Sequence, residues 1–378
     1  MQPDQVLDFL LKMKPLVIAE NRVLVERRFT DHGYAARFDV EGQDPKAYVT
    51  EADTHMNFLF TYVSDKLLGI PSYGEESLKD RDETIKQKTY SVWDPVDGTG
   101  GYVNGLYESC GTLGAVMINN EPVGAIAYAP ETRALSIATR WHEPIYEIDG
   151  VPQKPAEPAD FIYSVHRTEA WNPKLDIFLE WLAWKTGLKA EVVEGGGPGS
   201  FGAAHFKYPY TAFSGTVGNG NWKEWDVAAP QLILERNAWR TSDIRGQRHT
   251  FGNPRPNYDH GFLATRLDHL GITHEEFVRY LGQFTETYKD RTDIPMPVLD
   301  LPDAKDSKGK PIALDDDSTR GTIMITDKIY TAFAHSDRLR EWKEKMWTVD
   351  PKDRHKLLKR EIFEPTLLHF GDFPHRYL

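Results

Sequence analysis

The stretch Trp93-Asp94-Pro95-Val96-Asp97-Gly98-Thr99 carries two aspartates three residues apart at the end of an apolar run. The alternating residues Thr89 to Trp93 predict a strand, and Pro95 with Gly98 predicts a turn where that strand ends. Both carboxylates can then project into one pocket. Because Mg²⁺ prefers oxygen ligands and keeps waters that a phosphate can replace, the pair is a candidate for binding a hard cation.

The same residues also fit a plain Pro/Gly turn, in which the aspartates only form the turn and cap the next helix. Gly98 permits a close approach of the backbone, and a helix that starts near Thr99 would turn free N–H groups toward an anion. The local stretch alone leaves both readings open.

Three further acid-bearing stretches favour the metal reading when they are taken together. Each has a simple alternative: a helix start for Asp53, a solvated loop for Glu75 and Glu76, and an N-cap for Asp226. The stretches are Val49-Thr50-Glu51-Ala52-Asp53, Gly74-Glu75-Glu76-Ser77 and Glu224-Trp225-Asp226-Val227-Ala228-Ala229.

The charge distribution limits the class of ligand. Residues 1–303 contain 30 Lys and Arg against 44 Asp and Glu, whereas residues 304–378 contain 15 against 13. An acidic body argues against a nucleic-acid polymer as partner, since phosphate backbones need a basic surface. The chain lacks an apolar run of about 18 residues and a basic, then apolar, start, so we expect a soluble, cytoplasmic protein without a membrane partner. The single cysteine, Cys110, excludes a disulfide framework and is interpreted as a small buried hydrophobe.

Periodicity predicts an α/β chain with boundaries near Gly150 and Asp290. The expected parts are residues 1–150, an α+β half with most metal ligands; residues 151–289, an α/β half that completes the site; and a C-terminal extension, residues 290–378. Expected helices cover residues 5–28, 49–68, 173–186 and 227–235. Expected strands cover residues 89–93, 109–118, 122–128 and 135–139 as an antiparallel meander, followed by residues 161–165 and 190–193.

Taken in order and spacing, the acidic motifs resemble those of the inositol monophosphatase family, which includes 3'(2'),5'-bisphosphate nucleotidases and is related to fructose 1,6-bisphosphatases. The resemblance covers about Gln5 to Leu281. It implies a layered αβαβα sandwich and a phosphoric monoester hydrolase that uses two or three Mg²⁺ ions and is sensitive to lithium.

The resemblance also implies the metal ligands. Glu75, Asp94 and the carbonyl of Val96 would hold one Mg²⁺, and Asp94, Asp97 and Asp226 would hold a second, with Asp94 as the bridge.

A third, weaker ion would lie near Glu75 and Asp53. Thr99 with Asp53 would orient or deprotonate the attacking water, and Glu75 is counted with them as catalytic. Gly98 and Thr99 would bind the substrate phosphate.

The substrate is left open between a phosphorylated sugar, a cyclitol and a nucleotide. Residues 208–221 carry no charge where inositol monophosphatases have an acid, and Ala203 stands where bisphosphate nucleotidases tend to have Lys. A 3'(2'),5'-bisphosphate nucleotidase is the alternative enzyme, supported by Ser164-Val165-His166-Arg167-Thr168. A catalytically silent metal-binding scaffold is the alternative of another class.

Two other segments need an interpretation. Gly197-Pro198-Gly199-Ser200-Phe201-Gly202 fits a dinucleotide-binding pattern, but Pro209 would end the following helix early, and the resemblance instead assigns the Gly199-Ser200 step to packing near the substrate. Residues 290–378 contain many aromatic and apolar side chains, which we expect to pack on the core or across a homodimer contact.

Overall fold

The computed structural model describes residues 1–30, 50–103, 110–166, 178–179, 182–183, 186–215, 222–258 and 261–288. The chain divides into two units. Unit 1 comprises residues 1–167, 192–215 and 220–274, and unit 2 comprises residues 168–191, 216–219 and 275–378. The predicted extension, residues 290–378, and most of the predicted helix at residues 173–186 lie outside the described residues.

A seven-stranded sheet forms the centre of unit 1, with its strands in chain order from β1 to β7. β1 runs parallel to β2, and every later neighbour is antiparallel, so the predicted meander is confirmed. The strands are β1 (Ser72–Gly74), β2 (Thr89–Asp97), β3 (Gly111–Ile118), β4 (Glu121–Ala129), β5 (Ala134–Thr139), β6 (Ile145–Ile148) and β7 (Val151–Pro152).

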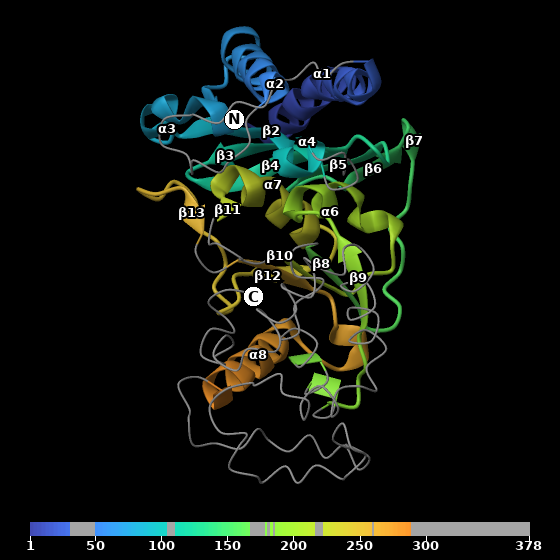
Figure 1. Cartoon of the computed structure of the whole chain (residues 1–378). Helices are drawn as coiled ribbons and strands as arrows, with labels where there is room; N and C mark the ends of the chain where they lie inside the picture. Colours follow the sequence, from blue (N-terminus) through green and yellow to red (C-terminus); the bar gives the residue numbers. More distant parts are fainter. Residues whose placement is uncertain are drawn as a thin grey trace, which may run out of the picture. The chain divides into compact units, whose positions relative to one another are not determined.

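Two helices cover one face of this sheet, α1 (Pro3–Thr30) and α2 (Glu51–Tyr62), as Figure 1 shows. Pro15 lies inside α1 without ending it. Thr50 is the N-cap of α2 and Asp53 is its third residue, so the two form a capping box at the helix start expected here. A short π-helix, η1 (Val63–Leu67), follows α2. The apolar side chains of both helices pack on the outward-facing residues of β2 to β5, including Val116, Ile126 and Ile137.

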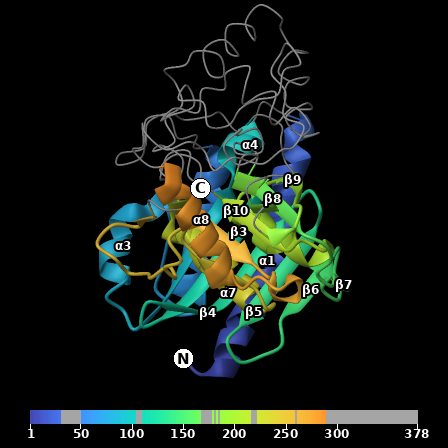
Figure 2. The same ribbon diagram turned by 90° about the horizontal axis from the view of Figure 1, so that it is seen from below.

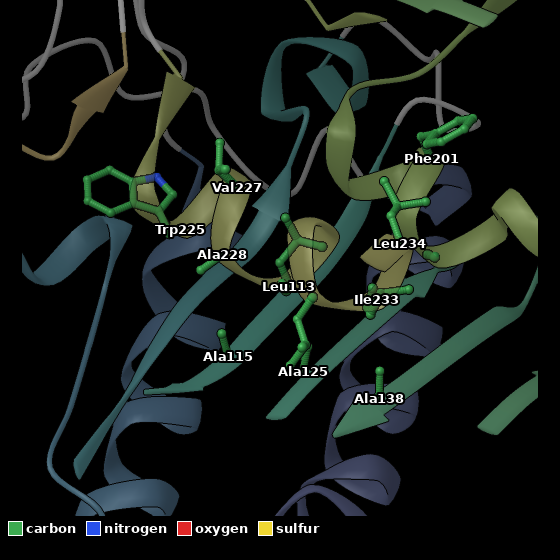
Figure 3. Close-up of a cluster of buried hydrophobic side chains, with 14 of the residues drawn as sticks. Leu113, Ala115, Ala125, Ala138, Phe201, Trp225, Val227, Ala228, Ile233 and Leu234 are labelled. Carbon is green, nitrogen blue, oxygen red and sulfur yellow. The ribbon is translucent and has the colours of Figure 1, made fainter. Parts of the chain in front are cut away.

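The opposite face of the sheet packs against α6 (Pro198–Ala204) and α7 (Glu224–Glu235). In both views α7 lies over β4 (Figures 1 and 2). Three small residues on the strands, Ala115, Ala125 and Ala138, face α7 and its residue Ile233 (Figure 3). Their small side chains let the helices pack close to the sheet. This close packing brings the first residues of α7 to the end of β2.

A second sheet of five strands lies in the order β12-β14-β10-β8-β9, and β11 pairs with β13. The predicted strands at residues 161–165 and 190–193 are confirmed as β8 and β9. The bounds are β8 (Ile162–His166), β9 (Glu191–Gly195), β10 (Ala212–Gly215), β11 (Trp222–Lys223), β12 (Arg240–Ser242), β13 (Asn257–Tyr258) and β14 (Phe262–Thr265).

Short helices complete unit 1. They are η2 (Glu75–Ser77), α3 (Leu78–Thr84), α4 (Thr99–Val103), η4 (His205–Lys207) and η5 (Asp268–Leu270). η4 follows α6 directly, so the helix after the glycine-rich pattern is short, as Pro209 predicts.

Unit 2 contributes α8 (His274–Tyr288) to the described residues. Phe277 of this helix meets Phe178 edge to face, with 5.8 Å between the ring centroids. Of the helices that the structure describes, none combines the length and the apolar character required to cross a bilayer.

Candidate metal centre

A β-bulge at the end of β2 aims the two aspartates of the opening stretch to the same side. Asp94 pairs with Leu113 of β3 and Asp97 pairs with Gly111, so Pro95 and Val96 together oppose the single residue Thr112. In a regular strand, side chains three residues apart point to opposite faces. The extra residue changes this alternation.

The bulge brings Asp94 and Asp97 together with Asp226 of α7. One carboxylate oxygen of each lies within 4.8 Å of the others, and all three side chains are buried. The negative charge of Asp226 raises the pKa of Asp94, as expected for two buried carboxylates that lie this close together. Three acids from two segments 130 residues apart thus form one group, which we call the three-aspartate group.

Burial dominates the electrostatics of this group. Desolvation raises the pKa of Asp94 well above its usual value, and the negative charges of Glu75, Asp226 and Asp97 raise it further. Desolvation and the charge of Asp226 raise the pKa of Asp97 to about 8, although the backbone amides of Ser200 and Gly199 oppose the rise. Such acids cannot all ionise unless a cation compensates their charge.

Two oxygens test whether a cation fits. Asp94 Oδ1 and Asp97 Oδ2 are buried, and neither has a hydrogen-bond partner within the described part of the chain. A buried polar atom without a partner is rare and requires an explanation. Hard divalent cations bind carboxylate oxygens, so the donor set and its unpartnered atoms suit Mg²⁺.

The backbone of α6 fixes one side of Asp97. The backbone N–H groups of Gly199 and Ser200 face the Asp97 carboxylate closely enough to lower its pKa. A Cβ atom on Gly199 would lie 2.1 Å from Asp97 Oδ2, so only glycine permits this approach. The Gly199-Ser200 dipeptide, which the resemblance assigns to packing near the substrate, therefore lies against a carboxylate of the three-aspartate group.

Asp53 and Thr99 form a hydrogen-bonded pair, as the sequence interpretation requires. Thr99 Oγ1 lies 2.8 Å from Asp53 Oδ1 and 2.9 Å from the carbonyl oxygen of Val96, so its single proton serves one acceptor at a time. Asp53 also accepts from the Thr50 backbone at 2.7 Å. Gly98 precedes Thr99 with φ of 81°, in the left-handed region that favours glycine, and α4 begins at Thr99.

Glu75 faces the same region without joining the three-aspartate group. Its side chain is half-buried, and desolvation followed by the charges of Asp226, Glu76, Asp53 and Asp97 raises its pKa well above the usual value. The structure therefore brings the five predicted acids into one electrostatic neighbourhood, in which Asp94, Asp97 and Asp226 lie closest together.

The N-cap reading of Asp226 needs a correction. Lys223 is the N-cap of α7, and Asp226 is the third residue of the helix. Asp226 Oδ2 accepts from the Lys223 backbone N–H at 2.7 Å. One carboxylate oxygen thus stabilises the helix start, and the side chain still reaches Asp94.

Two residues that the sequence interpretation missed support the bulge. Thr112 Oγ1 donates to the Pro95 carbonyl at 2.6 Å, and Asn21 Nδ2 of α1 donates to Thr112 Oγ1 at 2.8 Å. Both side chains are buried. A polar residue in an otherwise apolar strand was the available signal, but the carbonyl that it serves is created by the bulge.

Solved structures share this fold. The IMPase of Thermotoga maritima has 18% identity and a TM-score of 0.51, covering 74% of this chain and 98% of its own. CysQ from Bacteroides thetaiotaomicron has 16% identity and a TM-score of 0.52, covering 66% and 93%. An IMPase/NADP phosphatase solved with Mg²⁺ and phosphate has 16% identity and a TM-score of 0.53, covering 74% and 96%. These likenesses confirm the expected α/β sandwich fold.

No curated protein matches the chain. Residues 21–280, which include every acid of the site, match the inositol monophosphatase family. This match extends over more than half of the 378 residues and confirms the resemblance seen in the motifs. The chain therefore belongs to the inositol monophosphatase family, whose members are phosphoric monoester hydrolases.

Proposed function

We propose that this protein is a Mg²⁺-dependent phosphomonoesterase that hydrolyses a small phosphorylated sugar, cyclitol or nucleotide. The observation that carries the proposal is the three-aspartate group, with its buried and unpartnered Asp94 and Asp97 oxygens. The IMPase/NADP phosphatase that shares the fold was solved with Mg²⁺ and phosphate, which supports the same ion here.

Asp94, Asp97 and Asp226 would hold Mg²⁺, with Glu75 and the Val96 carbonyl as further ligands. When bound, Mg²⁺ acts as a Lewis acid that neutralises phosphate oxygens, lowers the pKa of water and stabilises the leaving alkoxide. Asp53 and Glu75 would be the ligands of a third, weaker ion.

The chain's own residues would move the proton of the attacking water. Thr99 Oγ1 lies within hydrogen-bond distance of Asp53 Oδ1, so a proton that Thr99 accepts from water has a path to the Asp53 carboxylate. Gly98 and the N–H groups at the start of α4 would bind the phosphate. The phosphorus–ester oxygen bond breaks as the water oxygen attaches. The leaving alkoxide takes up one proton from solvent water, which balances the proton passed to Asp53.

A panel of phosphate esters assayed with Mg²⁺ tests the proposal by the phosphate released. The panel should contain sugar phosphates, cyclitol phosphates, nucleoside monophosphates and a 3',5'-bisphosphate nucleotide. We expect release from at least one class, its loss in excess chelator, and its suppression by Li⁺. Full turnover in excess chelator would contradict the proposal.

Asp94→Asn is the matched variant, because it removes one charge at nearly constant volume. We expect it to abolish phosphate release while the protein remains folded. Asp243→Asn is the control: Asp243 is also buried, but its carboxylate accepts from the backbone of Arg245 and Gln247, at 2.8 Å each. Retained turnover in Asp94→Asn would refute the assignment of this residue to the metal.

A further inference from the structure

A buried ion pair joins α3, which directly follows the short helix η2 with Glu75, to α7, which carries Asp226. Arg81 of α3 donates through Nε to Glu224 Oε1 of α7 at 2.5 Å, and the two side chains are 3% and 2% exposed. We call this pair the Arg81–Glu224 clamp.

Neighbouring groups hold both partners of the clamp. The Tyr73 hydroxyl donates to Glu224 Oε1, and the Gly252 N–H donates to Glu224 Oε2 at 3.3 Å. Arg81 Nη2 donates to the Asn253 carbonyl at 2.6 Å. Three donors from separate segments thus converge on one buried carboxylate, which fixes its position.

Such a pair is not explained by stability alone. Removing two charges from water costs about as much as their attraction returns, and well-packed apolar residues often serve equally well. The charges instead fix an orientation, because the guanidinium of arginine forms hydrogen bonds to a carboxylate in a defined geometry. If the pair acts by fixing geometry, a neighbouring group must depend on the exact position of α3 or α7.

The neighbouring residues in the sequence are the proposed metal ligands. Tyr73 lies two residues before Glu75, and α3 with Arg81 follows directly after the short helix that contains Glu75. Glu224 is the first residue of α7, two residues before Asp226. The clamp therefore connects residues that are 143 positions apart in the sequence, each close to a proposed metal ligand.

The clamp also separates two acids of one motif. Residues two apart on an α-helix point about 200° apart, so Glu224 and Asp226 face different surroundings. Asp226 faces Asp94, whereas Glu224 is neutralised by Arg81. The arginine thus keeps a second buried acid of α7 out of the group available to a cation.

We propose that Arg81 and Glu224 are positioning residues, which set the geometry of Glu75 and Asp226 for Mg²⁺ binding. The inference rests on the metal-dependent activity proposed above. It adds that this activity depends on a salt bridge with no metal contact of its own.

Calorimetric titration of Mg²⁺ into the full chain, without substrate, tests the clamp. We expect Arg81→Met to bind Mg²⁺ about 10- to 100-fold more weakly, the range found when groups that orient metal ligands are removed. The double variant Arg81→Met/Glu224→Gln removes both charges, so it should fold more readily than Arg81→Met and still bind Mg²⁺ weakly. Arg81→Lys keeps the charge and should recover part of the affinity.

Arg248→Met is the control at the other end of α7, where the pair is more exposed, with side chains 39% and 26% exposed. Arg248 Nε donates to Glu235 Oε1 at 2.8 Å at the other end of α7, so the variant removes an Arg–Glu pair that touches neither acidic motif. Its Mg²⁺ affinity should equal that of the wild type. The melting temperature of each variant is measured in parallel.

The measured Mg²⁺ affinities distinguish failure of the positioning role from failure of the proposed function. Unchanged Mg²⁺ affinity in the folded double variant overturns the positioning role and leaves the proposed function intact. An equal loss of affinity in Arg248→Met also overturns it, because the effect would then reflect general destabilisation. Absence of Mg²⁺ binding in the wild type refutes the proposed function and this inference with it.

Discussion

At the scale of single residues, Thr112 shows how one buried hydroxyl supports the site. It donates to the Pro95 carbonyl, which the β-bulge removes from the strand ladder, and it accepts from Asn21. A buried carbonyl or amide that loses its partner costs about 1–3 kcal/mol. The hydroxyl is therefore worth more to the fold than its size suggests.

We predict that Thr112→Val lowers the free energy of unfolding by about 1–3 kcal/mol, since valine has the same shape but no hydroxyl. Urea denaturation followed by tryptophan fluorescence measures the change. Thr112→Ser keeps the hydroxyl and should lose less. A valine variant as stable as the wild type would show that the Pro95 carbonyl finds another partner.

His205 provides a second test at this scale, through the pH dependence of stability. It is fully buried, its Nδ1 donates to the Gly202 carbonyl at 2.9 Å, and burial lowers its pKa to about 3, with Arg266 nearby adding to the effect. The unfolded chain takes up the proton near pH 6.5, whereas the folded chain does not. Acidification therefore favours the unfolded state.

We predict that this residue costs the wild type about 2 kcal/mol of stability at pH 5 relative to neutral pH, with the loss growing toward pH 3. His205→Gln should lack this contribution. The measurement is the difference between the two proteins in melting temperature, from pH 7.5 to pH 4.5, which cancels the titration of other groups. Parallel curves for the two proteins would contradict the assignment.

At the scale of elements, the pairing of β2 with β3 depends on a glycine beneath a tryptophan. Trp93 pairs with Gly114 across the two strands, and a Cβ atom on Gly114 would lie 2.2 Å from the Trp93 ring. The same ring packs on Phe60 of α2, with 5.1 Å between centroids. The tryptophan that precedes the metal motif is therefore held by a strand and a helix.

We predict that Gly114→Ala destabilises the protein by about 1–3 kcal/mol, because the buried ring has to move and overpacked cores lose stability by this amount. Chemical denaturation measures it. Gly69→Ala is unsuitable as a control, because Gly69 has a φ of 70°, where alanine would be strained. Ala115→Gly, in the same strand as Gly114, is the better control because it loses packing and adds no atoms. A neutral Gly114→Ala would mean that Trp93 relaxes freely.

At the scale of the whole molecule, the acids of the site oppose folding when no cation is bound. Asp94, Asp97, Asp226, Asp53 and Glu75 raise one another's pKa values or are raised by burial. Like charges in a buried group repel, so the metal-free fold carries a strain that a divalent cation removes. Stability and metal binding are therefore coupled.

We predict that Mg²⁺ raises the melting temperature of the wild type, because a ligand that binds only the folded state stabilises it. Asp94→Asn should differ from the wild type in two ways, in the stability of its metal-free form and in its response to Mg²⁺. Its metal-free form should be more stable, because asparagine neither carries a buried charge nor has to take up a proton on folding, and its response to Mg²⁺ should disappear. Thermal unfolding with chelator and with Mg²⁺ provides both readings. An Asp94→Asn protein with the full Mg²⁺ response would contradict this coupling.

Much of this architecture is determined by sequence patterns of short range. The alternation of residues 89–139 predicts four strands in meander order, which the structure confirms. The stretch with Thr50 and Asp53 predicts a helix start, and both residues lie at the start of α2. The acidic motifs also identify the residues that meet in the site. These features depend on local periodicity, helix caps and turn residues, so they can be read from neighbours in the chain.

The tertiary structure decided how those residues meet. The order of residues alone does not reveal the β-bulge that turns Asp94 and Asp97 to one side, because a bulge depends on the register with β3. Nor does it separate Asp226 from Glu224, which are equally acidic and two residues apart. Only the packing of α3 and α7 places Arg81 against Glu224 and leaves Asp226 to Asp94. Contacts between segments more than a hundred residues apart have no local pattern, so they follow from the folded core alone.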